Sequence, residues 1–329
     1  MPLRWLSRVL EGGVAKAPAT LPAPLPIEQI TPLLRSHLGL PHLDWEQAAI
    51  RIEPATTRQT NLDDLACATI AAWLDALALA WQPRQAIDLE RWRSPGVEGL
   101  APSVDRKRLD RATSTALAII GRALAPIRGE PNENPIDRIA IIAAPTRDAY
   151  YDFIDAYYRD EGAFATSGGV YLGASVLNPP TLVLNVDRTA LEHTVAHELT
   201  HHALAPTERD AGRLPLWAEE GLTQMMEERV TNSTHFAFDR EKLRRHQGLW
   251  SSIGLDGFLH GDTFQSPHDD QQELSYNLAE AITRSLLESR PTDFFAFARA
   301  CRAGQEPDGA CMAHLGASQE HLLSALLRL

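Results

Sequence analysis

The sequence of 329 residues predicts an α+β domain that is preceded by a mainly helical N-terminal region. Ala- and Leu-rich segments dominate before residue 128, whereas short apolar strand patterns followed by helices come after residue 137. The stretch RGEPNENPID (128–137) separates the two textures, and its prolines, glycine and polar residues predict a domain boundary. We therefore expect an N-terminal segment over 1–32, a helical domain over 33–130 and an α+β domain over 131–329.

The N-terminal part is expected to provide structural support. The Pro-rich stretch AKAPATLPAPLPIEQITP (15–32) is typical of an extended connector. Residues 43–125 are expected to be mainly helical, most clearly at LDDLACATIAAWLDALALAW (62–81), which Pro83 should end. A second helix is expected at STALAIIGRALAPI (114–127). No residue in these helices has a recognisable chemical role.

The α+β part is expected to alternate strands and helices before a helical tail. Strands are predicted at RIAIIAA (138–144), GGVYLGA (168–174) and TLVLNV (181–186), and a helix at TRDAYYDFIDAYYRD (146–160). The next helix should begin near Thr189, which forms a capping box with Glu192, and should end before Pro206. Three apolar residues spaced four apart should anchor this helix in the core: Leu191, Val195 and Leu199.

Composition excludes some functions and leaves others open. A net charge of −12 argues against binding to nucleic acids or anionic membranes. No run of eighteen apolar residues occurs, so no membrane span is expected. The first residues, MPLRWLSRVLEGG, lack the apolar run of a signal peptide, which favours the cytoplasm but leaves export open. Three cysteines predict no disulfide framework, and pairing of Cys301 with Cys311 is left open.

The segment TVAHELTHHALAP (194–206) contains the pattern H-E-x-x-H. His197 and His201 are four residues apart, so in a helix they lie on one face and can reach one metal ion. Glu198 lies beside the first histidine, where this motif places the general base for an attacking water molecule. Because this pattern arises by chance in roughly a few per cent of such chains, a second signal is needed.

The second signal is an acidic pair in LPLWAEEGLTQMMEE (214–228), in which Glu220 follows His201 after eighteen residues. Here the sequence resembles the gluzincin metallopeptidases, the zincins that include aminopeptidase N-like and thermolysin-like enzymes. WAEEGLT is similar to their W-x-x-E-G-x-x segment, and the likeness is strongest over residues 193–228. The resemblance implies a zincin-like domain with a small sheet, and one Zn²⁺ held by His197, His201 and Glu220. Glu219 would then be a neighbouring polar residue.

The resemblance also implies a peptide or protein substrate, laid along an edge strand near 168–186. The chain lacks the Gly-x-Met-Glu-Asn segment of aminopeptidase N-like enzymes, so an endopeptidase is implied rather than an exopeptidase. It also lacks the further histidine of the metzincin pattern. The likeness is closest to small bacterial gluzincin-like proteins with a HELTH…W-x-x-EGL core.

Other polar residues are weaker candidates for the site. Tyr276, in ELSYNLAEAITRSLLE (273–288), occupies a segment like one found downstream in such proteins, and it is a candidate oxyanion donor or else a packed core residue. His260 and His268 lie in a predicted loop and are alternatives for that role. Four residues near the motif are expected outside the ligand set: His193, His202, Glu227 and Glu228.

The sequence therefore predicts zinc-dependent hydrolysis of peptide bonds, with Glu198 as general base and Tyr276 as oxyanion donor. Three alternatives stay open. The chain could be an inactive zincin-like module that binds peptides, or it could hold a structural zinc closed by a fourth ligand such as Cys301 or Cys311. The helical N-terminal half could also be an inhibitory or docking segment, with the Pro-rich residues 15–32 threaded across the cleft.

Overall fold

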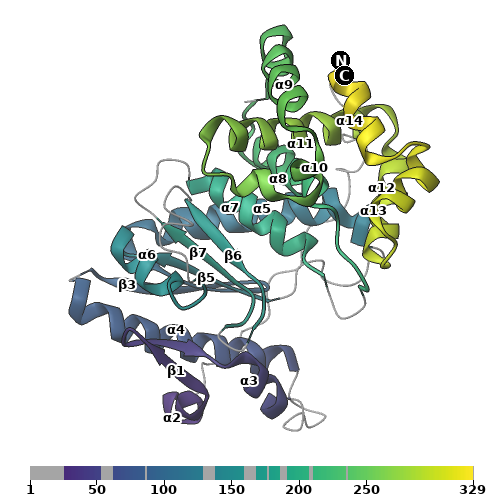
Figure 1. Cartoon of the computed structure of the whole chain (residues 1–329). Coiled ribbons are helices and arrows are strands. Elements are labelled where there is room, and N and C mark those ends of the chain that lie inside the picture. Colours follow the sequence, from purple (N-terminus) through teal and green to yellow (C-terminus); the bar gives the residue numbers. More distant parts are fainter. Residues whose placement is uncertain are drawn as a thin grey trace. The chain divides into compact units, whose positions relative to one another are not determined.

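The computed structural model describes residues 26–52, 62–85, 87–128, 138–158, 168–175, 178–185, 191–206, 210–234 and 236–328. They form an α+β protein with small sheets and many helices (Figure 1). The chain divides into two compact units. In the described residues, one unit holds residues up to 118 together with 138–202, and the other holds 119–128 together with 203–328.

The first unit is built around a mixed sheet of five strands in the order β3-β4-β5-β7-β6. The strands are β3 (Leu89–Ser94), β4 (Val97–Pro102), β5 (Ile139–Ala144), β6 (Gly169–Leu172) and β7 (Thr181–Asn185). β4, β5 and β7 are parallel, whereas β3 and β6 pair antiparallel with their neighbours at the two edges. Every residue of β5 and β7 is buried, as expected for central strands covered on both faces.

A large apolar core lies on one side of this sheet. It joins α4 (Leu62–Gln85) and α6 (Arg147–Ile154) to the hairpin of β1 (Leu34–His37) and β2 (Leu40–Leu43). The largest core side chains are aromatic: Trp73, Trp81, Tyr150 and Phe153. Short elements before and after the hairpin complete this region: α2 (Ile27–Ile30), η1 (Thr31–Leu33) and α3 (Trp45–Ile52). Helices α5 (Ser103–Arg128) and α7 (Leu191–Leu204) follow β4 and β7 along the chain.

The second unit is helical. Its elements are α8 (Leu216–Thr231), α9 (Arg240–Ile253), α10 (Asp256–His260), η3 (Asp262–Gln265), α11 (Asp269–Ser289), α12 (Pro291–Arg302), α13 (Pro307–Ala310), η4 (Cys311–Leu315) and α14 (Gln319–Leu327). Helices α8 and α11 pack closely: a Cβ added at Gly221 would lie 2.3 Å from the carbonyl oxygen of Ala279. Only glycine allows the two backbones to pack this tightly.

The predicted strands and main helices are confirmed. β5, β6 and β7 lie within the three predicted strand segments, and the chain after residue 210 is mainly helical. Helix α4 includes the predicted 62–81 helix but continues past Pro83 to Gln85. Helix α5 begins eleven residues before the predicted segment, at Ser103, and α6 ends earlier than expected, at Ile154. The capping residue Thr189 lies outside the described residues.

Two hairpins qualify the prediction that the domain over 33–130 is mainly helical, because it also contains the strands β1 to β4. In β1–β2, Leu38 and Gly39 both have positive φ angles, of 48° and 74°, which suits a two-residue hairpin turn. In β3–β4, Pro95 and Gly96 form the turn, and a Pro-Gly pair is a turn signal. The connector predicted over 15–32 is not extended throughout, because Ile27–Leu33 forms helical turns.

The domain boundary predicted near residue 130 does not divide the structure in that way. Most of the segment 128–137 lies outside the described residues. The central sheet nevertheless takes β3 and β4 from before it and β5, β6 and β7 from after it. The pairing of β4 with β5 therefore joins the two predicted domains in one sheet.

One described helix is long and apolar enough to cross a membrane, judged by length and composition. It is the stretch Leu65–Gln82 of α4, and 67% of it is buried inside the protein. The core helix of a protein without membrane spans can have the same properties. This finding therefore neither supports nor opposes the expectation of no membrane span.

Candidate metal centre

Helix α7 carries the H-E-x-x-H motif and is anchored as predicted. Leu191, Val195 and Leu199 are all buried and form one stripe of the helix. The helix ends at Leu204, before Pro206, and its last carbonyl accepts a hydrogen bond of 2.7 Å from Nη1 of Arg302. A guanidinium at this end is favourable because the carbonyls of the last turn carry partial negative charge.

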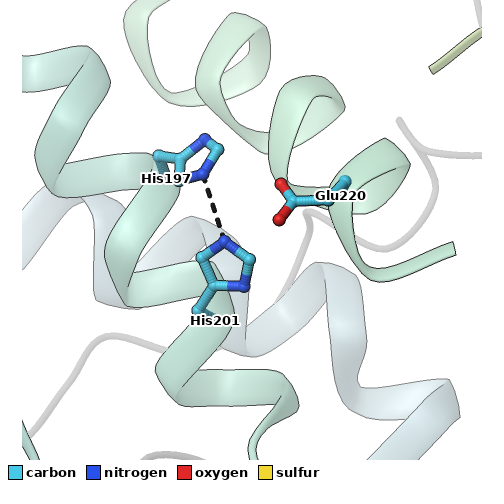
Figure 2. Close-up of side chains that lie close together, drawn as sticks. All are labelled: His197, His201 and Glu220. Carbon is cyan, nitrogen blue, oxygen red and sulfur yellow. Dashed lines mark hydrogen bonds between the residues drawn. The ribbon is translucent and has the colours of Figure 1, made fainter. Parts of the chain in front are cut away.

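The structure brings the three predicted metal ligands together. His197, His201 and Glu220 offer ligand atoms that all lie within 4.8 Å of one another. Figure 2 shows the two imidazoles and the carboxylate pointing toward one another. The Nε2 atoms of His197 and His201 are 3.1 Å apart, close to the separation of about 3.3 Å that two nitrogens adopt around one tetrahedral zinc. Two imidazoles and one carboxylate in this arrangement could hold a single metal ion, and the donor types are ones that zinc accepts.

The local sequence explains why Glu220, and not Glu219, points to the cluster. Glu220 is buried and Glu219 is half-buried on the adjoining face of α8. Thr223, one turn further on, donates a hydrogen bond of 2.6 Å to the carbonyl oxygen of Glu220. Its hydroxyl also lies 3.3 Å from Oε2 of the same residue. This buried threonine therefore steadies the backbone and the carboxylate of Glu220.

The start of α8 is fixed by a tryptophan. Trp217 is buried, stacks on Phe297 with ring centroids 5.8 Å apart, and donates a hydrogen bond of 2.7 Å to Gln319. Because Trp217 comes three residues before Glu220, it anchors the first turn of the helix that presents the carboxylate. The tryptophan of the WAEEGLT segment thus has a structural explanation.

Glu198, the predicted general base, is only 9% exposed and is held by the sheet. The backbone N–H of Tyr171, in β6, donates a hydrogen bond of 2.8 Å to its Oε2. Burial raises the pKa of Tyr158, and the negative charge of nearby Glu198 raises it further. Glu198 is therefore close to two tyrosines, Tyr158 and Tyr171, that were not predicted as site residues.

A recognisable signal existed for one of these tyrosines. Gly168 and Gly169 precede Tyr171, and glycines in a strand often mark a close approach of another segment. A Cβ at Gly169 would lie 2.7 Å from the side chain of Thr194 on α7. Tyr158 comes from the turn after α6, and no sequence pattern connects it with Glu198.

The other candidate residues have contacts of their own. The ring of Tyr276 packs edge-to-face on Phe264, with centroids 5.3 Å apart, and its role as oxyanion donor stays a prediction. His260 is exposed and bonds to the carbonyl of Asp256. His268 lines an open pocket of about 360 Å³, and none of the residues lining this pocket is one of the three cluster residues.

The residues expected outside the ligand set have other partners or positions. His202 bonds to the hydroxyl of Tyr171, and His193 is half-buried on α7. Glu228 pairs with Arg284 and accepts a hydrogen bond from the backbone of Phe236. Glu227 accepts a hydrogen bond from Gln224. Each of the two glutamates therefore bonds to a neighbour.

Cys301 and Cys311, considered as closing ligands, are both buried free thiols, and neither belongs to the cluster of three. The cluster thus consists of two histidines and one carboxylate, as described. Comparison with known proteins adds nothing to this picture: no family model matches the chain, and no curated protein matches it significantly.

Proposed function

We propose that the protein is a zinc-dependent, gluzincin-like metallopeptidase that cleaves within peptide chains. The observation that carries this proposal is the convergence of His197, His201 and Glu220 with Glu198 beside them. Three protein ligands that leave one position open are the arrangement of catalytic zinc sites, whereas structural sites take four. The nature of the donor set therefore favours a catalytic role over a structural one.

A zinc ion held by this set would supply a Lewis acid that makes water acidic enough to react near neutral pH and polarises a carbonyl. Glu198 would accept a proton from the attacking water at one carboxylate oxygen. It would then deliver that proton to the nitrogen of the departing amine. Tyr276 remains the proposed donor to the developing oxyanion.

The proposed substrate is an extended peptide or protein segment beside β6. This strand is at the edge of the sheet and pairs only with β7 among the described strands. An extended chain can add to such an edge through backbone hydrogen bonds, which bind many sequences with similar strength. This mode supports a peptidase that acts within a chain.

The first test is metal content, measured by elemental mass spectrometry on the purified wild-type protein and Glu220→Ala. We expect about one zinc per chain in the wild type, since the three ligands form one site. The variant should lose most of it. Glu219→Ala is the matched control, because it removes a neighbouring carboxylate that lies outside the cluster. A wild-type protein that binds no zinc after reconstitution would contradict the proposal.

The second test is hydrolysis of a library of internally quenched peptides. Glu198→Gln should retain zinc but lose nearly all turnover, because the amide cannot accept the proton of the attacking water. Full activity in this variant would exclude Glu198 as the base. A wild type that holds zinc and binds peptides without cleaving them would instead identify an inactive binding module.

A further inference from the structure

Two neighbouring rows of side chains run along α7. His197 and His201 form one row, which belongs to the metal cluster. The adjacent row, about 100° further round the helix, consists of Thr194, Glu198 and His202. Each residue of this second row contacts β6 or Gly168, the residue just before it.

The contacts of the second row follow the strand residue by residue. Thr194 lies against Gly168 and Gly169, where an added Cβ would come within 2.9 Å and 2.7 Å of its side chain. Glu198 accepts the hydrogen bond of 2.8 Å from the N–H of Tyr171. His202 lies 3.2 Å, Nδ1 to Oη, from the hydroxyl of the same tyrosine, and the two rings are 5.4 Å apart.

The geometry of the sheet explains why the N–H of Tyr171 is directed at the helix. In an antiparallel pair, residues alternate between those that bond to the partner strand and those whose N–H and C=O point away. The N–H of Asn185 bonds to the carbonyl of Gly168, so the bonded positions of β6 are 168, 170 and 172. Tyr171 is paired with Leu182 at a position whose N–H faces the outer edge.

We propose that Tyr171 is the positioning residue of the metal centre, since its backbone N–H holds the Glu198 carboxylate and its hydroxyl fixes His202. The expected effect on kcat rests on the proposed peptidase function, whereas the contact itself does not. Glu198 and His202 each follow a histidine of the metal cluster by one residue. One residue of β6 therefore holds α7 at two points, one turn apart, directly beside both histidine ligands.

The bond restricts Glu198 in a way that suits a general base. A glutamate side chain has several rotatable bonds, and ordering it costs conformational entropy. With Oε2 bound by the N–H of Tyr171, the carboxylate is ordered before a substrate arrives. The donor is a backbone group, so only replacement by proline removes it. A substrate laid along β6 must then pair with backbone groups other than this N–H.

Hydrogen exchange of the Tyr171 amide, followed by NMR in the full chain, tests the contact without any need for activity. We expect Glu198→Ala to accelerate exchange at Tyr171 at least tenfold while leaving the amide of Val170, which faces β7, unchanged. Equal exchange at Tyr171 in the two proteins would overturn the assignment. Equal acceleration of both amides would overturn it too, because it would show general loosening of β6.

Steady-state kinetics of three variants then test whether the contact between Tyr171 and Glu198 affects catalysis. Tyr171→Phe removes only the hydroxyl, Tyr171→Ala removes the ring, and Tyr171→Pro removes the N–H as well. Proline is tolerated on edge strands where the N–H faces outward. Relative to Tyr171→Ala, we expect Tyr171→Pro to lower kcat by about 10- to 100-fold, as for other residues that orient a catalytic group. KM and zinc content should change little.

Equal kcat values for Tyr171→Pro and Tyr171→Ala would overturn the positioning role. If the proline variant does not fold, the amide exchange measurement still decides whether Tyr171 holds Glu198. A wild-type protein without hydrolytic activity would refute the proposed function. In that case the exchange result would show separately whether the contact between strand and helix exists.

Discussion

His42, in strand β2, is fully buried, and its ring lies 4.8 Å from that of Phe153. Its Nδ1 is 3.0 Å from the hydroxyl of Tyr157, and its Nε2 has no hydrogen-bond partner among the described residues. Burial, and to a smaller extent the charge of His37, lowers the pKa of His42 from 6.5 to about 4. The folded protein therefore keeps this histidine neutral where an unfolded chain would protonate it.

This shift predicts a loss of stability in mild acid. Below pH 6.5 His42 becomes protonated in the unfolded state but stays neutral in the folded state. The free energy of unfolding therefore falls as the pH drops. The loss accumulates until the pH reaches about 4, and it amounts to about 3 kcal/mol. Urea unfolding of the wild type and of His42→Gln at pH 7 and pH 4.5 measures it.

The two proteins should respond differently to acid. His42→Gln lacks the titrating group, so its stability should fall less between the two pH values. The pKa of buried His246 is also lowered, mainly by burial, and this contribution is common to both proteins. Parallel losses in the wild type and in His42→Gln would show that His42 does not carry the effect.

At this scale, the sequence predicted the part of the site that depends on local spacing. His197 and His201 share a helix face because they are four residues apart, and the structure places them so. Tyr171 could not be predicted in the same way. It reaches Glu198 through a backbone N–H, 27 residues away along the chain, and such a contact leaves no signature in side-chain type.

At the scale of elements, the approach of α8 to α11 depends on Gly221. A Cβ at this position would lie 2.2 Å from Oγ1 of Thr283 and 2.3 Å from the carbonyl of Ala279. Gly221→Ala should therefore force the helices apart and destabilise the protein by about 1–3 kcal/mol. Because Glu220 is the preceding residue, the variant should also hold zinc more weakly. Urea unfolding and metal content measure the two effects.

Gly248 provides the matched control. It lies in α9, is exposed, and an added Cβ would meet nothing within 4 Å. Gly248→Ala should stabilise the protein by about 0.5–1 kcal/mol, because alanine has the higher helix propensity. If both alanine variants were equally stable, the close packing at Gly221 would not be the cause.

A strand could be predicted from the sequence where its buried residues form an apolar run. β5 is a continuous apolar run and β7 has an apolar centre, Leu-Val-Leu, so both were predicted. β1 and β3 contain charged and polar residues in LRSH and LERWRS, which do not differ clearly from the surface of a helix. Only their turns, Leu38-Gly39 and Pro95-Gly96, indicated hairpins.

At the scale of the whole molecule, the order of strands in the sheet was the feature least predictable from the sequence. β4 and β5 pair in parallel although α5 and the segment after it separate them along the chain. Periodicity describes one element at a time and contains no information about which strands become neighbours. For this reason the boundary predicted from composition near residue 130 cut through the sheet.

Metal binding should also affect the stability of the whole chain. A ligand that binds only the folded state stabilises it, by about 2.7 kcal/mol at a concentration of 100 times Kd. Removing zinc with a chelator should thus lower the thermal midpoint by several degrees. Glu220→Ala should show no such response, and scanning calorimetry can compare the two proteins. A chelator effect of equal size in both would place the responsible metal elsewhere.

The three cysteines offer a practical route to such measurements. Cys67, Cys301 and Cys311 are all buried. Burial raises the pKa of Cys67 to about 11 and those of Cys301 and Cys311 to about 12. Alkylating dyes react with the thiolate, which is scarce at neutral pH in groups of this kind. A cysteine introduced on the surface can therefore carry a fluorophore or spin label selectively, while the native cysteines are left in place.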